Sequence, residues 1–320
     1  MKCPKCGSEN VSYNASKKTY ACISLKQVYF GENSKLKEIS SSAFSGTPWR
    51  ENIQNGIVYY GPIASDIEGF HRVGSNIVIK TGTRAITREV LRDIDLLNII
   101  FPNSLINVNG EDLHKTDWFN SHTNGLVYIS NVVCGYNGDS AKVKTIELPN
   151  RAKGISSYAF ANTHGLRNFS MEDSVEYIGE NAFFNSSLEN IRISDNIERI
   201  CNDTFYRCIK LRSIALPKNM YHIDCFAFCS CVALERIIIY DKVKVIANRA
   251  FENCYNLKNV YYIGTEEQWN KIEIDAGNEC LLKAKRYYFS EIAPIDVEKT
   301  GDFWHFAEDG KTPVIWGEGH

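Results

Sequence analysis

The side chains of this 320-residue chain with the clearest capacity for chemistry are its eleven cysteines. Cys3 and Cys6 are separated by two residues, a spacing with which a tight turn directs two thiolates at one tetrahedral zinc ion. Cys22 adds a third thiolate, but Leu25 stands where the partner in a second pair would be. Because three-ligand zinc sites are normally catalytic rather than structural, two interpretations stay open. Cys3, Cys6 and Cys22 bind zinc, or they form a degenerate knuckle with free thiols.

A second group of cysteines, Cys208, Cys231 and Cys254, suggests a metal cluster by number alone. Each cysteine, however, follows a phenylalanine by three residues, and the 23-residue spacing is that of a sequence repeat. Other copies of the repeat have Ser186 or Thr163 at this position. The position therefore requires a small side chain that can be buried, which free cysteine provides. We expect these three thiols to be reduced, buried and without metal.

The sequence contains no recognised catalytic motif. It lacks H-E-x-x-H, G-x-S-x-G, a phosphate-binding loop and G-x-G-x-x-G, and its seven histidines fall at unrelated positions of the repeat. We therefore expect a protein that is not an enzyme.

The repeat itself is the main organising feature of the chain. Its copies are 22 or 23 residues long and align three hydrophobic positions, which are Phe160, Phe183, Phe205, Phe228 and Phe251; Leu166, Leu188, Leu211, Leu234 and Leu257; and Ile155, Ile178, Ile200, Ile223 and Ile246. A unit of this length cannot bury its own apolar face, so units must stack on their neighbours. The pattern predicts a solenoid.

Within one unit, Leu211, Ile214 and Leu216 are expected to point inward and Ala215 outward, which is the alternation of a half-buried strand. The segment around each phenylalanine is too short for an independent helix. These residues resemble the BspA-type leucine-rich repeats, a class of about 23 residues per copy. The resemblance implies an α/β-type repeat solenoid, with a parallel sheet on one face, short helical or irregular segments opposite, and a C-terminal cap.

We expect four regions along the chain. Residues 1–24 resemble an incomplete zinc-ribbon knuckle, 25–264 form the solenoid, 265–290 the cap and 291–320 a tail rich in aromatic residues. An offset of 69 residues aligns Trp49 with Trp118 and Asn55-Gly56 with Asn124-Gly125. This offset indicates a super-repeat of three units, one of them divergent, and the Asn-Gly pairs are expected to form tight reversals.

The outward strand positions supply the candidate binding residues. Ile238, Tyr240, Tyr261 and Ile263 should form an apolar patch on the sheet, which is typical of an interaction surface. Two arrangements stay open, because the tail either covers this patch or packs on the cap and leaves it free. If the tail covers the patch, the binding face moves to earlier repeats around Arg192 and Ser194.

Composition limits the possible partners. The formal net charge of −2 argues against a nucleic-acid partner, and no apolar run is long enough for membrane insertion. The N-terminus has no apolar signal segment and the cysteine content fits a reducing compartment, so a cytoplasmic location is expected, with the cell surface as the alternative. We expect a protein–protein interaction module or scaffold whose partner the sequence does not identify. The alternatives are an adhesin or host-contact protein, and a zinc-binding adaptor.

Overall fold

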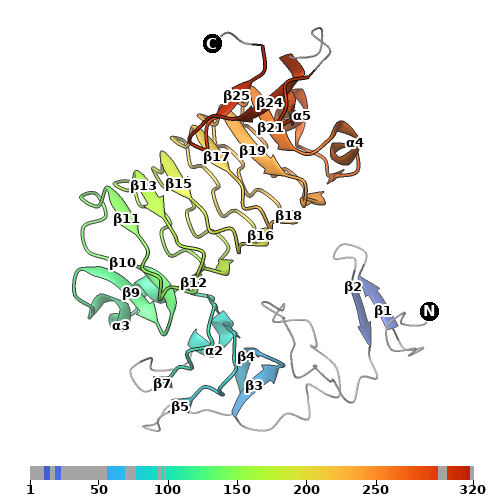
Figure 1. The fold of residues 1–320 in the computed structure, drawn as a ribbon. Helices are drawn as coiled ribbons and strands as arrows, with labels where there is room; N and C mark the ends of the chain where they lie inside the picture. Colours follow the sequence, from blue (N-terminus) through green and yellow to red (C-terminus); the bar gives the residue numbers. More distant parts are fainter. Residues whose placement is uncertain are drawn as a thin grey trace.

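The computed structural model describes residues 11–14, 19–22, 56–68, 77–92, 96, 99–294 and 301–317, of which 11–14, 19–22, 56 and 66–68 are described by their backbone. Short strands recur along the chain and stack turn upon turn into an elongated solenoid (Figure 1). Before the solenoid, β1 (Val11–Asn14) and β2 (Thr19–Cys22) form an antiparallel hairpin. Residues 23–55, in which the sequence predicts the start of the solenoid and which include Trp49, lie outside the described residues.

One side of the solenoid is a stack of strands that we call the first ladder. Its members are β5 (Ile77–Val78), β7 (Ile99–Ile100), β11 (Thr145–Glu147), β13 (Asn168–Ser170), β15 (Asn190–Arg192), β17 (Ser213–Ala215), β19 (Arg236–Tyr240), β21 (Asn259–Ile263) and β23 (Lys285–Phe289). All pairs within it are parallel, which confirms the expected sheet. Pairing is interrupted between β7 and β11 and between β15 and β17. Leu188, Leu211, Leu234 and Leu257 nevertheless remain buried in one core.

A second ladder, which the sequence did not predict, contains the column isoleucines. Its members are β4 (Ile63–Glu68), β6 (Ala85–Ile86), β8 (Asn107–Val108), β10 (Val132–Asn137), β12 (Gly154–Ile155), β14 (Tyr177–Ile178), β16 (Arg199–Ile200), β18 (His222–Ile223), β20 (Val245–Ile246) and β22 (Glu273–Ile274). Most of these strands have two residues, with the isoleucine buried. Its parallel pairs, like those of the first ladder, join residues one repeat apart.

The turn segments that carry the column phenylalanines lie between the two ladders and form a third set of hydrogen bonds. The Phe183 N–H donates to Thr204 O at 2.9 Å, and Phe205 and Phe228 continue this series at 2.8 Å. The residues two before and two after each phenylalanine have positive φ, as Asn181 (57°) and Asn185 (53°) show. The five phenylalanine rings are fully buried and stacked, with centroids 5.1–5.5 Å apart. The stacked rings therefore fill the core between successive repeats.

Helix is scarce in the described residues. The helical segments are α2 (Arg88–Arg92), η2 (Leu113–Lys115), α3 (Asp117–Asn120), α4 (Glu266–Trp269) and α5 (Glu279–Lys283). None of them exceeds five residues, so the side opposite the first ladder consists of turns and two-residue strands.

The divergent repeat contains a β-hairpin at both of its occurrences. β3 (Gly56–Tyr60) pairs with β4, and β9 (Gly125–Ile129) pairs with β10. Each hairpin contains one register shift, which falls between Val58 and Tyr59 in the first hairpin and between Val133 and Gly135 in the second. The 69-residue super-repeat is thus present in three dimensions. The Asn-Gly pairs are not the reversals we expected, because Gly56 and Gly125 begin strands. The chain reverses at Gly61 (φ 60°) and at Ser130 (φ 55°).

Residues 265–290 close the C-terminal end by adding one more turn, since β22 pairs with β20 and β23 with β21. Asn278 ends the series of turn hydrogen bonds. Its Oδ1 accepts from the Phe251 N–H at 3.0 Å, where earlier turns use a backbone carbonyl, and its Nδ2 donates to Ala247 O and Asp275 O at 2.9 Å. A buried side-chain amide therefore replaces the backbone of the next repeat.

Candidate binding surface

The outer face of the first ladder presents two rows of side chains. Row A contains Thr145, Asn168, Asn190, Ser213, Arg236, Asn259 and Lys285, and row B contains Glu147, Ser170, Arg192, Ala215, Ile238, Tyr261 and Tyr287. The residues between the rows point into the core, as shown by the buried Ile214 and the exposed Ala215. Row B changes from polar at β11 to aromatic at β23, so the outer face has two distinct halves.

The polar half, on β11 to β17, is open to solvent. Asn190 Nδ2 donates to Asn168 Oδ1 at 2.9 Å, and Asn168 Nδ2 donates to Thr145 Oγ1 at 3.4 Å. These amides connect neighbouring strands while remaining exposed. Arg192 is half exposed, with ion-pair distances of 3.7 Å to Glu172 and 3.6 Å to Asp173. Its guanidinium also donates to Met171 O.

Ser194 does not lie on this surface, which corrects our expectation. Its side chain is fully buried, and its Oγ donates to Val175 O at 2.7 Å. The alternation of inward and outward positions holds only within a strand, and β15 ends at Arg192. Beyond that residue the chain turns inward, so Ser194 satisfies the backbone of the preceding repeat.

The aromatic half is covered by the tail. β24 (Phe303–Phe306) pairs in parallel with β23, and β25 (Pro313–Ile315) pairs antiparallel with β24. Trp304 is fully buried against Tyr261, with ring centroids 5.4 Å apart, and its Nε1 donates to Tyr262 O at 3.2 Å. Ile238 and Tyr261 are 7% and 6% exposed, and together with Tyr287 and Trp304 they form a small core outside the solenoid.

Tyr240 and Ile263 are partly buried at the margin of this outer core. Of the two arrangements that the sequence left open, the structure has the one in which the tail folds back over the patch. Figure 1 shows the tail strands crossing the end of the first ladder. The tail also limits the sheet edge, because β25 has three residues and begins with a proline, which has no N–H to donate to another strand.

The cysteine column is buried, as expected. Cys208 donates from Sγ to Phe183 O at 3.2 Å, and Cys231 and Cys254 bond to Phe205 O and Phe228 O at 3.1 Å. Burial raises the pKa of Cys208 and Cys254 to about 12, and raises that of Cys231 as well. The three thiols are free of disulfides and hold neighbouring turns together as weak donors.

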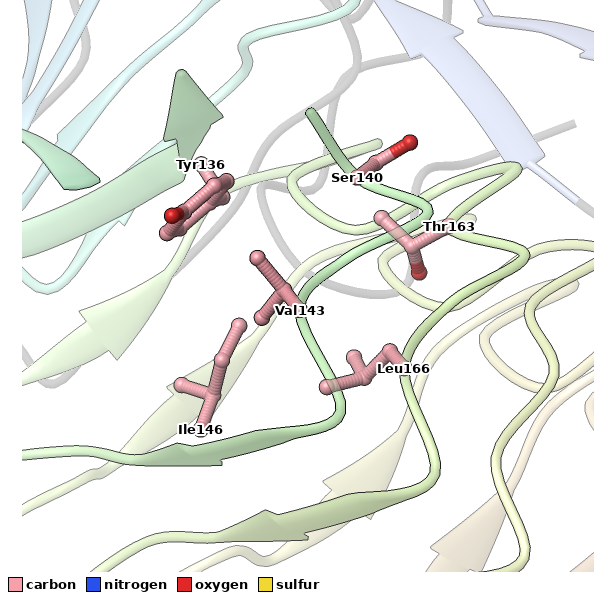
Figure 2. A pocket seen from close by; sticks show the side chains of 6 residues that line it. All are labelled: Tyr136, Ser140, Val143, Ile146, Thr163 and Leu166. Atoms are coloured by element: carbon pink, nitrogen blue, oxygen red, sulfur yellow. The ribbon is translucent and has the colours of Figure 1, made fainter. Parts of the chain in front are cut away.

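A shallow apolar depression lies between the divergent repeat and the first regular one. It encloses about 170 Å³, open side included, and is lined by Tyr136, Ser140, Val143, Ile146, Thr163 and Leu166 (Figure 2). Val143 occupies the position of the column leucine, so the depression arises where a shorter side chain replaces a leucine. It has the character of a packing gap, with no charged group in its lining.

The described residues include no group of three or more His, Cys, Asp or Glu side chains placed to hold a metal ion. A charged cluster does occur on the second ladder, where buried Asp224 lies 2.6 Å from Arg199 Nε and 2.6 Å from His222 Nδ1. This cluster neutralises a buried carboxylate between two repeats.

The predicted zinc ligands fall at the margin of the described structure. Cys22 is the last residue of β2, opposite Val11, while Cys3 and Cys6 lie outside the described residues. Zinc binding by these three cysteines therefore stays a prediction.

Arg167 Nε lies 3.3 Å from Glu189 Oε1 and forms an ion pair between neighbouring repeats along the first ladder. Reasoning from the sequence missed the pairing of the tail with β23. The only available signal was the high density of aromatic residues in the tail, which indicated burial without indicating a location.

Stacked parallel strands, a leucine column and a phenylalanine column define a leucine-rich repeat protein. The model of the BspA type leucine rich repeat region matches residues 7–58 and 136–258, in six copies. This match covers more than half of the sequence, and the chain belongs to that family.

Several solved structures of other proteins match part of this chain. A leucine-rich cell surface protein from Faecalibacterium prausnitzii A2-165 is 24% identical, with 63% of each chain covered and a TM-score of 0.45. A leucine-rich repeat protein from Bacteroides ovatus is 21% identical over 72% of this chain and 63% of that one, with a TM-score of 0.37. The pneumococcal vaccine antigen PcpA is 16% identical over 65% and 55%, with a TM-score of 0.45.

The chain thus spans less than two thirds of the length of the F. prausnitzii protein. No match was found among curated proteins. Of the helices in the described part of the chain, none has the length and apolar character needed to cross a membrane.

Proposed function

We propose that this chain is a non-catalytic binding module that presents the outer face of β11, β13, β15 and β17 to a protein partner. The observation that carries the proposal is the contrast between the two halves of this face. The aromatic half is covered by the protein's own tail, whereas the polar half remains open over four consecutive strands.

The physical character of the open half suits binding. Its positions are fixed by the ladder and by the stacked phenylalanines beneath it, so little conformational entropy is lost when a partner docks on the backbone scaffold. Its side chains are mainly small or carry amides, with Arg192 as the longest. Such a surface offers hydrogen bonds and the charged side chains of Glu147 and Arg192 over a flat area, and interface affinity depends on this kind of complementarity.

The test uses bulky substitutions on the open face. Asn190→Arg and Ala215→Arg together place two long side chains on exposed positions of row A and row B. The matched control is Asn150→Arg with Ala141→Arg, which makes the same changes at exposed positions outside the rows. Affinity capture from cells that produce the chain, with quantitative mass spectrometry, should recover a partner with the wild type and the control. Loss with the outer-face variant alone supports the proposal, whereas equal recovery with all three contradicts it.

Location and zinc content are separate proposals. We propose a cytoplasmic location, and fractionation of the producing cells distinguishes it from the cell surface. Zinc measurement on the purified chain and on a Cys3→Ser, Cys6→Ser variant decides whether the N-terminal thiols make the module a zinc-binding adaptor as well.

A further inference from the structure

Four cations lie along one margin of the first ladder, at two neighbouring positions of the repeat. Arg236 and Lys285 begin β19 and β23 in row A, on either side of Asn259. Arg212 and Lys258 directly precede β17 and β21, on either side of Glu235. All four cations are exposed, and we call them the basic strip.

The strip differs from the other charged positions of the solenoid. Arg167 is paired with Glu189, and Lys218 lies 3.1 Å from Asp195. Within the part of the chain that the structure describes, no carboxylate lies within ion-pair distance of the four strip cations, although Lys285 Nζ lies 4.8 Å from the Tyr287 ring centroid. Glu235 is the one acidic residue among the corresponding positions of these strands.

The four strip cations outnumber the single carboxylate of Glu235, which lies between Arg212 and Lys258. This margin therefore carries a net positive charge, which favours a negatively charged partner.

An apolar ridge follows the same margin of the sheet. Ile209 is 48% exposed, Tyr255 74% and Leu282 48%, and each lies three residues before a strip cation. Exposed apolar side chains grouped in this way are typical of an interaction surface. Aliphatic side chains have no counterpart in a nucleic-acid backbone, so the ridge favours a polypeptide.

We propose that the basic strip and the apolar ridge together bind an acidic polypeptide segment whose carboxylates alternate with aliphatic or aromatic side chains. This inference rests on the proposed binding function and names the chemistry of the partner. The tail covers row B of β19 to β23, whereas the strip cations lie in row A or one residue before it and remain exposed. Individual exposed ion pairs contribute little, and the interaction should weaken as salt screens it.

The experiment measures fluorescence anisotropy with the full chain and three labelled probes. The first is a 16-residue peptide that alternates Glu with Leu, the second alternates Glu with Ser, and the third is single-stranded DNA of equal charge. Arg212→Glu with Arg236→Glu reverses two strip charges. Lys218→Glu with Lys242→Glu makes the same change of net charge on the same two repeats, but beyond the other ends of their strands. Urea unfolding confirms that both variants are folded.

The Glu-Leu peptide should bind the wild type, and the strip variant should weaken this binding by about tenfold or more at low salt, because two attractive contacts become repulsive. The control variant should change it by less than about twofold, since its reversed charges lie outside the proposed contact. Tyr255→Ser should weaken binding of the Glu-Leu peptide more than that of the Glu-Ser peptide.

Three outcomes would overturn the inference: no binding of either peptide, an equal loss with the two charge-reversal variants, or DNA that binds as tightly as the Glu-Leu peptide. Failure here is distinguishable from failure of the proposed function. If Asn190→Arg with Ala215→Arg still abolishes partner capture, the binding module stands and the strip has no part in it.

Discussion

At the scale of single side chains, the same position in successive repeats faces the same environment. The residues found at one position therefore show which side-chain property that position requires. The phenylalanine column is fully buried in all five regular copies. The cysteine column accepts Ser186 and Thr163 because it requires only a small side chain that forms a hydrogen bond: Thr163 Oγ1 donates to Phe160 O at 2.7 Å, and Ser186 Oγ lies 3.4 Å from Cys208 Sγ. The first column depends on volume and the second on hydrogen bonding.

Replacing Phe228 by alanine should cost about 3–5 kcal/mol of unfolding free energy, because it removes a ring from the middle of the stack and leaves a cavity. Phe228 lies 5.2 Å from the Phe205 centroid and 5.1 Å from that of Phe251. Urea titration gives the measurement. Tyr255→Ala, at a 74% exposed position, is the control and should change stability by less than about 0.5 kcal/mol. A loss below about 1 kcal/mol for Phe228→Ala would show that the stack does not support the repeats.

The buried thiols should resist alkylation in the folded protein. Burial raises the pKa of Cys208 and Cys254 to about 12, so almost no thiolate forms at pH 8.5, and the thiols are inaccessible as well. Iodoacetamide should therefore modify the half-buried Cys280 first, and Cys208 and Cys254 only after addition of guanidinium. Peptide mass spectrometry reads each site. Rapid labelling of Cys208 at pH 8.5 in the native protein would contradict the burial of this column.

At the scale of elements, the repeat columns and the parallel strands followed from the sequence because each depends on a pattern within 23 residues. Ser194 was misplaced because the alternation was extended past the end of its strand. The β9–β10 hairpin was missed because its turn is at Ser130, where no glycine marks it. The pairing of β24 with β23 joins Phe289 to Trp304, and such pairing outside the repeat leaves no periodic signal in the sequence.

Asn278 should be essential to the C-terminal end of the solenoid. Asn278→Ala removes three hydrogen bonds to buried backbone groups, and leaving such groups unpaired should destabilise the protein by about 2–4 kcal/mol. Asn278→Asp retains the acceptor for the Phe251 N–H but loses both amide donors and buries a charge, so it should not restore stability. Thermal unfolding checks both variants. Wild-type stability in Asn278→Ala would show that water replaces the amide.

Truncation after Ala293 tests the tail. Removing β24 and β25 exposes Ile238, Tyr261 and Tyr287 and deletes the burial of Trp304, which alone should cost about 2–3 kcal/mol. We expect a lower urea midpoint together with new binding of a hydrophobic dye such as ANS. Trp304→Ala in the full chain should reproduce part of both effects. An unchanged midpoint without dye binding would show that the tail does not cover the patch in solution.

At the scale of the whole molecule, the β9–β10 hairpin separates two hydrophobic cores. Val127, Ile129, Val132 and Cys134 pack into the core of residues 64–134, whereas Val133 faces the core of the regular repeats. The hairpin also occupies one edge of β10, so β8 has no ladder partner on that side among the described strands. Direct links between the two parts include the Ser156 Oγ donation to Val108 O at 2.7 Å. Each block is therefore held mainly by its own core.

The two cores should unfold separately. The links between them include the ion pair between Arg84 and Glu176, at 2.7 Å, in which both side chains are about one-third exposed and which should contribute little to coupling. The first block has two regular turns beyond its hairpin, and the second block has a longer stack in which each turn is stabilised on both sides.

Hydrogen exchange measured by mass spectrometry should thus find faster exchange in β6 and β8 than in β18 and β20, although all four belong to the second ladder. Low concentrations of urea should increase this difference, because the smaller core opens first. Val133→Ala should accelerate exchange in the regular repeats next to the hairpin and leave β6 unchanged, since its side chain belongs to the second core. A single exchange rate for all four strands, responding together to urea, would mean that the hairpin transmits stability between the cores instead of separating them.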